Sequence, residues 1–159
     1  MPVMPSQATY DDANLILRLY ELRRDEKLRQ AREWFAMNCH ASSLEELQRL
    51  APPGSKENTY IRMVTSYWDM ACSFVTAGVL NQDLFLESSG ELLFVWERLR
   101  HIVPSLREFT KNPKAYHNLE TVANIFAKQF EARGPGAYEA FQAMVKGIRT
   151  PGGPAEKSE

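Results

Sequence analysis

Apolar residues recur at helical spacing along nearly the whole chain, and this periodicity limits the fold more than any other feature. In residues 56–78, Tyr60, Val64, Tyr67 and Ala71 follow one another at steps of four, three and four. These steps place the four side chains on one face of a helix. No segment alternates polar and apolar residues over a useful length, and no Asn-Gly or Asp-Gly hairpin turn occurs. The sequence therefore predicts an all-α fold.

The expected architecture is an irregular bundle of about five long helices plus short helices. A chain of 159 residues is long enough to bury one substantial core, so a single domain is expected. We assign residues 1–8 to a flexible N-terminus, residues 9–149 to the helical domain and residues 150–159 to a disordered tail. The tail assignment follows from its Pro, Gly and charged residues.

The first helix is predicted to be long. Thr9 can cap it, and Asp11 and Asp12 place negative charge in its first turn. The charged segment 23–27 consists mostly of residues that favour helix, and opposite charges fall at helical spacing around it. We therefore expect one continuous helix that extends to Phe35.

A further helix is predicted over residues 82–103, with Asn81 as its cap. One apolar stripe runs along it, formed by Phe85, Ser89, Leu92, Trp96, Leu99 and Val103. Ser89 is the small member of this stripe, and residues 88 and 90 beside it are small as well. Small side chains let another helix approach closely, so a helix crossing is predicted at this point. Glu91 and Arg98 are expected on the polar flank of this helix, facing solvent.

Two prolines indicate where the C-terminal half changes direction. Pro104 is expected to end or kink the helix that precedes it. Pro113 follows Asn112, and this pair predicts a helix start with Asn112 as cap and Pro113 in the first helical position. A final helix is expected from Tyr138 to Ile148, where apolar residues again recur at helical spacing.

No pattern for catalysis, a cofactor or a metal ion stands out. The two histidine–glutamate pairs, His117 with Glu120 and Glu97 with His101, are single pairs rather than the repeated motif of metal-binding bundles. There is no phosphate-binding glycine loop and no Gly-x-Ser-x-Gly elbow. We therefore predict no catalytic, cofactor-binding or metal-binding residues, and enzymatic activity is not favoured.

The cysteines and the absence of long apolar runs bear on location. Cys39 and Cys72 lie far apart without metal or redox spacing, which is typical of buried, reduced thiols. The longest unbroken apolar run, residues 92–96, is far shorter than a membrane helix, and no signal peptide pattern opens the chain. A soluble cytoplasmic protein is the expectation.

Three functions remain open at this stage. The first is a non-enzymatic interaction or structural module, which self-associates or binds a protein partner through leftover apolar stripes. The second is a small-molecule-binding or catalytic domain with a pocket between helices 56–78 and 82–103. Its candidate pocket residues are Tyr67, Asp69, Glu91, Trp96 and Arg107. The third is weak nucleic-acid binding through the arginine-rich first helix, which the net charge of −1 disfavours.

The segment from Ser66 to Glu108 also carries a recognisable pattern. Its marked positions are Trp68 and Asp69, then Gly78, Leu80, Asn81, Leu84 and Phe85, then Trp96 and Arg107. In these positions the segment resembles a bacterial family of all-helical proteins that contain a domain of unknown function. Asn81 stands where that family has Asp, and many members carry N-terminal membrane helices, which the sequence here does not show. The resemblance implies a helical fold and no particular activity.

Overall fold

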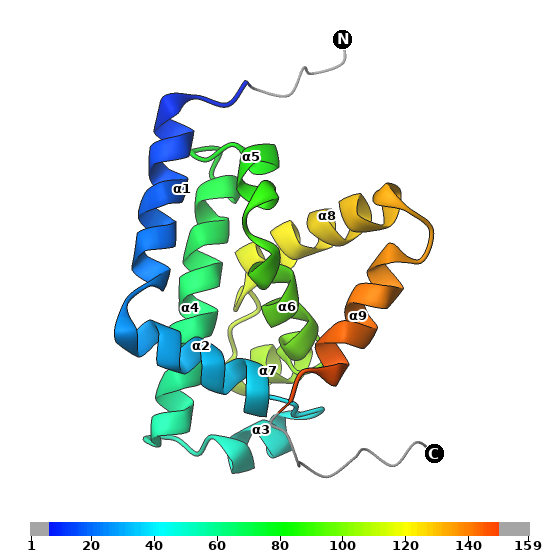
Figure 1. The fold of residues 1–159 in the computed structure, drawn as a ribbon. Helices are drawn as coiled ribbons and strands as arrows, with labels where there is room; N and C mark the ends of the chain where they lie inside the picture. Colours follow the sequence, from blue (N-terminus) through cyan, green and yellow to red (C-terminus); the bar gives the residue numbers. More distant parts are fainter. Residues whose placement is uncertain (1–6, 150–159) are drawn as a thin grey trace.

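The computed structural model describes residues 7–149 of the chain. The predicted tail and all but two residues of the predicted flexible N-terminus lie outside this range. Within it the chain forms nine α-helices and no strand, so the all-α prediction is confirmed (Figure 1). The helices are α1 (Tyr10–Arg23), α2 (Glu26–Asn38), α3 (Leu44–Leu50), α4 (Lys56–Thr76), α5 (Gln82–Glu87), α6 (Gly90–Leu99), α7 (Val103–Thr110), α8 (His117–Arg133) and α9 (Ala137–Gly147).

Helix α4 is the centre of the fold. It packs most extensively against α8 and α2, while α1 runs alongside it and α8 and α9 form a V-shaped hairpin (Figure 1). Its buried residues spread widely around the helix and include Ile61, Val64, Trp68 and Cys72. A helix that buries more than one face must have partners on several sides. Helix α4 accordingly packs against α2, α6 and α8.

The predicted long first helix is wrong, because the chain breaks it at Arg24 and Asp25. Asp25 adopts an extended conformation and its carboxylate accepts a hydrogen bond from the backbone N–H of Leu28 at 3.1 Å. It is thus the N-cap of a new helix, α2. Opposite charges at helical spacing contribute only a few tenths of a kcal/mol per pair, roughly, whereas an N-cap contributes about 1 kcal/mol.

The predicted helix over residues 82–103 is also two helices, α5 and α6, and they are separated at Ser88 and Ser89. Each member of the predicted stripe is nevertheless buried, including Ser89 with 4% of its surface exposed. The small residues do not mark a helix crossing at Gly90, since a Cβ added there would meet no atom within 4 Å. Instead they let the chain change direction while both halves of the stripe stay in the core.

The positions of the two prolines relative to the helices differ from the prediction. Pro104 lies in the first turn of α7 rather than ending a helix that contains it. Helix α8 begins at His117, after Tyr116, and Asn112 only closes a turn by accepting from the N–H of Lys114 at 3.1 Å. The expected helix start at Asn112 and Pro113 is therefore wrong. Asp69, from α4, accepts from the N–H of Leu119 and satisfies the first turn of α8 instead.

Candidate functional site

The five predicted pocket residues do not gather in one place. Asp69 lies against the start of α8, and Trp96 is buried in the core. Arg107 donates to the carbonyl of Ala115 at 3.0 Å and forms an ion pair with Glu120. Of the five, Tyr67 and Glu91 come into one neighbourhood.

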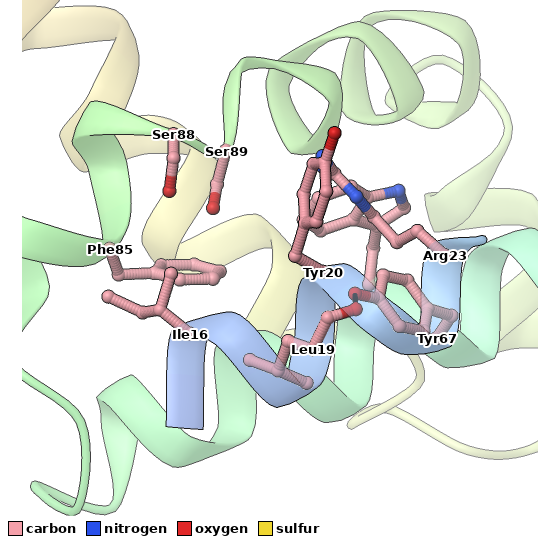
Figure 2. A pocket seen from close by; sticks show the side chains of 9 residues that line it. Ile16, Leu19, Tyr20, Arg23, Tyr67, Phe85, Ser88 and Ser89 are labelled. Carbon is pink, nitrogen blue, oxygen red and sulfur yellow. Dashed lines mark hydrogen bonds between the residues drawn. The ribbon is translucent and has the colours of Figure 1, made fainter. Parts of the chain in front are cut away.

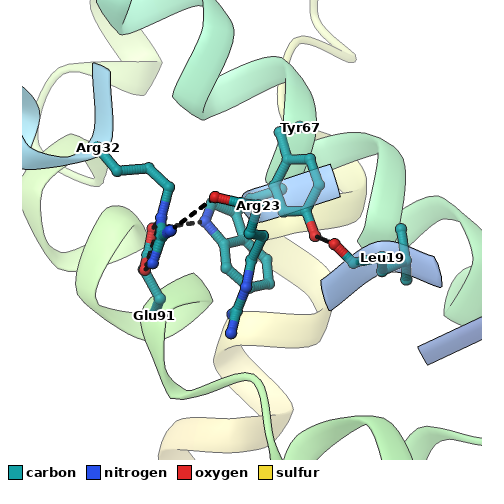
Figure 3. Close-up of polar contacts among 6 residues, drawn as sticks. Leu19, Arg23, Arg32, Tyr67 and Glu91 are labelled. Carbon is teal, nitrogen blue, oxygen red and sulfur yellow. Dashed lines mark hydrogen bonds and ion pairs between the residues drawn. The ribbon is translucent and has the colours of Figure 1, made fainter. Parts of the chain in front are cut away.

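Glu91 is the centre of a polar cluster. The prediction that it faces solvent is therefore wrong. Arg32 of α2 donates to its carboxylate through Nε (2.8 Å, to Oε1) and Nη2 (2.6 Å, to Oε2), and Trp68 donates its indole N–H to Oε1 at 3.2 Å (Figure 3). Arg32 also donates to the carbonyl of Arg23. The hydrogen bonds with Glu91 raise the pKa of Arg32, despite its partial burial. The cluster joins α2, α4 and α6, so its first role is structural.

Tyr67 fastens α1 to the central helix. Its hydroxyl donates to the carbonyl of Leu19 at 2.6 Å, and its ring packs edge-on against Trp68 (Figure 3). Burial raises the pKa of Tyr67 to about 12, so the phenol stays protonated near neutral pH. A phenol that is held as a donor to a backbone carbonyl is not available for proton transfer to a ligand.

A small hollow lies between α1, α4 and the α5–α6 connection, close to the predicted pocket. Its walls include Ile16, Tyr20, Phe85, Ser88 and Ser89 (Figure 2). Its volume is only about 20 Å³, which is room for one water molecule and not for a metabolite. The described residues therefore leave no usable pocket between α4 and α6 at this position.

An arginine-lined recess opens next to this hollow, at the bend between α1 and α2. Tyr20, Arg23, Arg24, Arg29 and Arg32 line about 340 Å³ of space, which we call the arginine recess. The guanidinium of Arg23 lies over the rings of Tyr20 and Trp68, at 5.0 and 5.3 Å from their centroids. The bend at Asp25, which the sequence analysis missed, brings these arginines together.

The charges of the arginine recess are only partly compensated. Arg32 is paired with Glu91, but within residues 7–149 neither Arg24 nor Arg29 has a carboxylate partner. The Nε of Arg23 is buried and has no acceptor among the described residues. The arginine recess therefore keeps guanidinium groups that no carboxylate of residues 7–149 pairs with.

Helix α1 presents an exposed apolar face that leads into the recess. Tyr10 is 90% exposed, Leu17 60% and Tyr20 52%. They are spaced by seven and three residues, which aligns them along one side of the helix. We call these three residues the α1 face. Tyr20 belongs to both surfaces, so the α1 face and the arginine recess are continuous.

Arg98 is the most deeply buried cation in the described part of the chain, although a solvent-facing position was predicted. It is 6% exposed. Its Nη1 donates to the carbonyls of Ala36 and Cys39 at 3.0 and 2.9 Å, and its Nη2 to those of Val145 and Ile148 at 2.8 and 2.9 Å. Burial lowers the pKa of Arg98 from its ordinary value. One guanidinium therefore satisfies the C-terminal ends of both α2 and α9.

The described residues offer little for metal or nucleophilic chemistry. Nowhere in residues 7–149 do three or more His, Cys, Asp or Glu side chains come close enough to hold a metal ion. Both cysteines are buried and free of disulfide bonds. Burial raises the pKa of Cys39 to about 12 and also raises that of Cys72, so neither thiol is an activated nucleophile.

The comparisons with known proteins identify a family. The family model of the domain of unknown function DUF4760 matches residues 8–126, so the chain belongs to that family. The match extends well beyond the segment 66–108 on which the resemblance was recognised. No curated protein and no solved structure matches the chain. None of the helices in residues 7–149 has the length and apolar character needed to cross a bilayer.

Proposed function

We propose that this member of the DUF4760 family is a non-enzymatic interaction domain that binds a partner protein. Its binding surface is the α1 face together with the arginine recess. The occupant is an extended or helical segment of the partner that carries both acidic and apolar side chains. The observation that carries the proposal is the continuity of the two surfaces through Tyr20, which is half exposed and lines the recess.

The chemistry of each surface supports one half of this ligand. Tyr10 and Leu17 expose apolar surface along a single line, and such lines bind apolar side chains of a partner. Arg24 and Arg29 add guanidinium groups that lack carboxylate partners within residues 7–149. Guanidinium groups bind carboxylates through paired hydrogen bonds. Charge complementarity therefore favours an acidic segment.

Nucleic acid fits this surface less well. Glu21, Asp25 and Glu26 are exposed beside the recess, and the chain as a whole carries a net charge of −1. A phosphate backbone presents charge at short, regular intervals and would meet these carboxylates as well as the arginines. A peptide can place its few acidic residues against the recess alone.

The proposal places the protein in a bacterial cytoplasm. The two buried, unbridged thiols support a reducing compartment. The lack of a metal-binding group and of an activated nucleophile in residues 7–149 supports a binding role over catalysis.

The test is a selection from a random peptide display library against the folded protein. Selected peptides are expected to combine Asp or Glu with Leu, Phe or Trp. A synthetic selected peptide is then titrated into isotope-labelled protein, and the amide signals of residues 17–32 are expected to shift. The double variant Arg24→Ala with Arg29→Ala should weaken peptide binding by about tenfold or more.

One control variant and three contrary outcomes make the result decisive. Arg62→Ala removes an exposed arginine from another surface, beside Tyr116, and should leave peptide affinity unchanged. Selection of peptides without acidic residues would contradict the proposal. So would duplex DNA that binds more tightly than the peptide at low salt, or a dimer in sedimentation that Leu17→Ser dissociates, because a second copy would then cover the α1 face.

A further inference from the structure

A second polar cavity lies at the end of α6 that is remote from Glu91. It is enclosed by the α2–α3 connection, the end of α6 and helix α9, and its volume is about 420 Å³. Sites for small metabolites typically have volumes of a few hundred Å³. We call it the α9 cavity. The side chains that matter for its chemistry are Glu97, Arg98, Arg100, His101 and Lys146.

Arg98 alone binds the helix ends beside this cavity, so the other cations of the cavity are not needed for that structural role. The C-terminal ends of α2 and α9 both point into this region, and helix C-termini attract positive charge. Arg98 already donates to two carbonyls at each of these ends. Arg100 and Lys146, which are exposed at the cavity, are therefore not required to neutralise them.

One carboxylate lines the cavity, and it is already bound. Glu97 has a side chain that is 7% exposed. It accepts from the hydroxyl of Tyr138 and from Nε2 of Gln142 at 3.3 Å, and it forms an ion pair with Nε of Arg100 at 3.4 Å. The pKa of Tyr138 is raised to about 12, chiefly by burial, so its phenol remains a donor. The two terminal nitrogens of Arg100 have no hydrogen-bond partner within the described residues.

Because Arg98 is taken up by the carbonyls at the two helix ends, the cations left to the cavity are Arg100 and Lys146, against the single lining carboxylate of Glu97. The imidazole of His101 adds a further hydrogen-bonding group at the same walls, whereas the hydroxyl of Ser42 already donates to the carboxylate of Glu46 at 3.0 Å. A surplus of charge inside a concave, partly enclosed site favours a ligand of opposite sign.

We propose that the α9 cavity binds a small-molecule anion through a phosphate or carboxylate group. Arg100, Lys146 and His101 contact the anionic group, and Glu97 holds Arg100 in place. This site is separate from the peptide-binding surface of the proposed function and does not depend on it.

The test uses inorganic phosphate and citrate as probes for the two kinds of group. Each is titrated into isotope-labelled protein at constant ionic strength, and backbone amide shifts are recorded. Saturable shifts are expected for residues 40–42, 100–101 and 142–146, with a Kd of about 1 mM or lower for the preferred group. The double variant Arg100→Ala with Lys146→Ala should weaken this binding by about tenfold or more.

Matched variants decide where the anion binds. Arg62→Ala with Lys128→Ala removes the same charge from exposed positions on α4 and α8 and should leave the affinity unchanged. Arg24→Ala with Arg29→Ala should also leave it unchanged. Loss of binding in the recess variant would overturn the proposal, and so would the absence of saturable shifts. Urea unfolding of each variant confirms that the compared proteins are equally folded.

Discussion

Arg98 and the arginines of the arginine recess are the same residue type in opposite situations. Arg98 is enclosed, and its Nη groups are occupied by backbone carbonyls of α2 and α9. Arg24 and Arg29 are exposed and have no carboxylate partner among the described residues. Arg32 is intermediate, since it is partly buried and paired with Glu91.

The difference separates stability from recognition. A buried cation that satisfies backbone groups is costly to remove, because its partners cannot reach water. An exposed cation contributes little to stability, because water solvates it equally well in the folded and unfolded chain. Guanidinium groups in the second situation are the ones that remain able to bind a partner. The following substitutions test this ordering.

The largest effect is expected at Arg98. Arg98→Met keeps much of the side-chain volume but leaves the carbonyls at the ends of α2 and α9 without a donor. We expect a loss of about 3–5 kcal/mol in the free energy of unfolding, measured by urea denaturation. Arg98→Lys keeps the charge but cannot reach both helix ends, so an intermediate loss is expected. A change below about 0.5 kcal/mol in Arg98→Met would contradict the structural role.

The next effect is expected at Glu91. Glu91→Gln removes the charge that binds both nitrogens of Arg32 and leaves a weaker acceptor for Trp68. A loss of about 1–2 kcal/mol is expected from thermal or urea unfolding. A double-mutant cycle with Arg32→Ala isolates the pair, and a coupling energy near zero would show that the ion pair contributes nothing.

A smaller and more local effect is expected at Tyr67. Tyr67→Phe removes one hydroxyl, so the carbonyl of Leu19 loses its donor while the ring still packs against Trp68. The expected loss is about 1 kcal/mol. Hydrogen exchange should show faster opening of α1 with little change in α8. Equal acceleration of exchange in both helices would place the hydroxyl's contribution in the global fold and not in the attachment of α1.

The smallest effect on stability is expected in the recess. Arg24→Ala with Arg29→Ala should change the free energy of unfolding by less than about 0.5 kcal/mol, while it weakens peptide binding by about tenfold or more. This variant is the counterpart of Arg98→Met. A loss of several kcal/mol would mean that the recess arginines stabilise the fold, and the distinction between the two regions would then fail.

The helical fold was predictable because it depends on local signals. The caps at Thr9, Ser55 and Asn81 and the buried breadth of α4 can all be recognised in the sequence. The break at Asp25 had a signal as well, since Asp is a strong N-cap, but the helix-favouring residues around it outweighed that signal in the sequence reading.

The polar contacts were not predictable for a different reason. Arg98 binds backbone carbonyls, and a carbonyl carries no side-chain identity that a pattern in the sequence can display. Arg32 and Glu91 are 59 residues apart, and a chain with 19 basic and 20 acidic residues offers many such pairs. Which pair forms depends on how α2 packs against α4 and α6, and these helices are far apart in the sequence. No local pattern indicates that packing.

The hydrogen bonds from Arg98 to Val145 and Ile148 make the core depend on a helix that lies outside the family match. The match to the family model ends at residue 126, before α9 begins. Yet a cation in the core obtains part of its compensation from the last turn of α9 and the residue that follows it. During synthesis, the guanidinium of Arg98 on α6 can therefore bind the carbonyls at the end of α2 before α9 has been made, but it gains its remaining acceptors only when α9 has formed. A fragment cut at residue 126 would lose the C-terminal part of α8 and all of α9, and with α9 the carbonyls that compensate one side of Arg98.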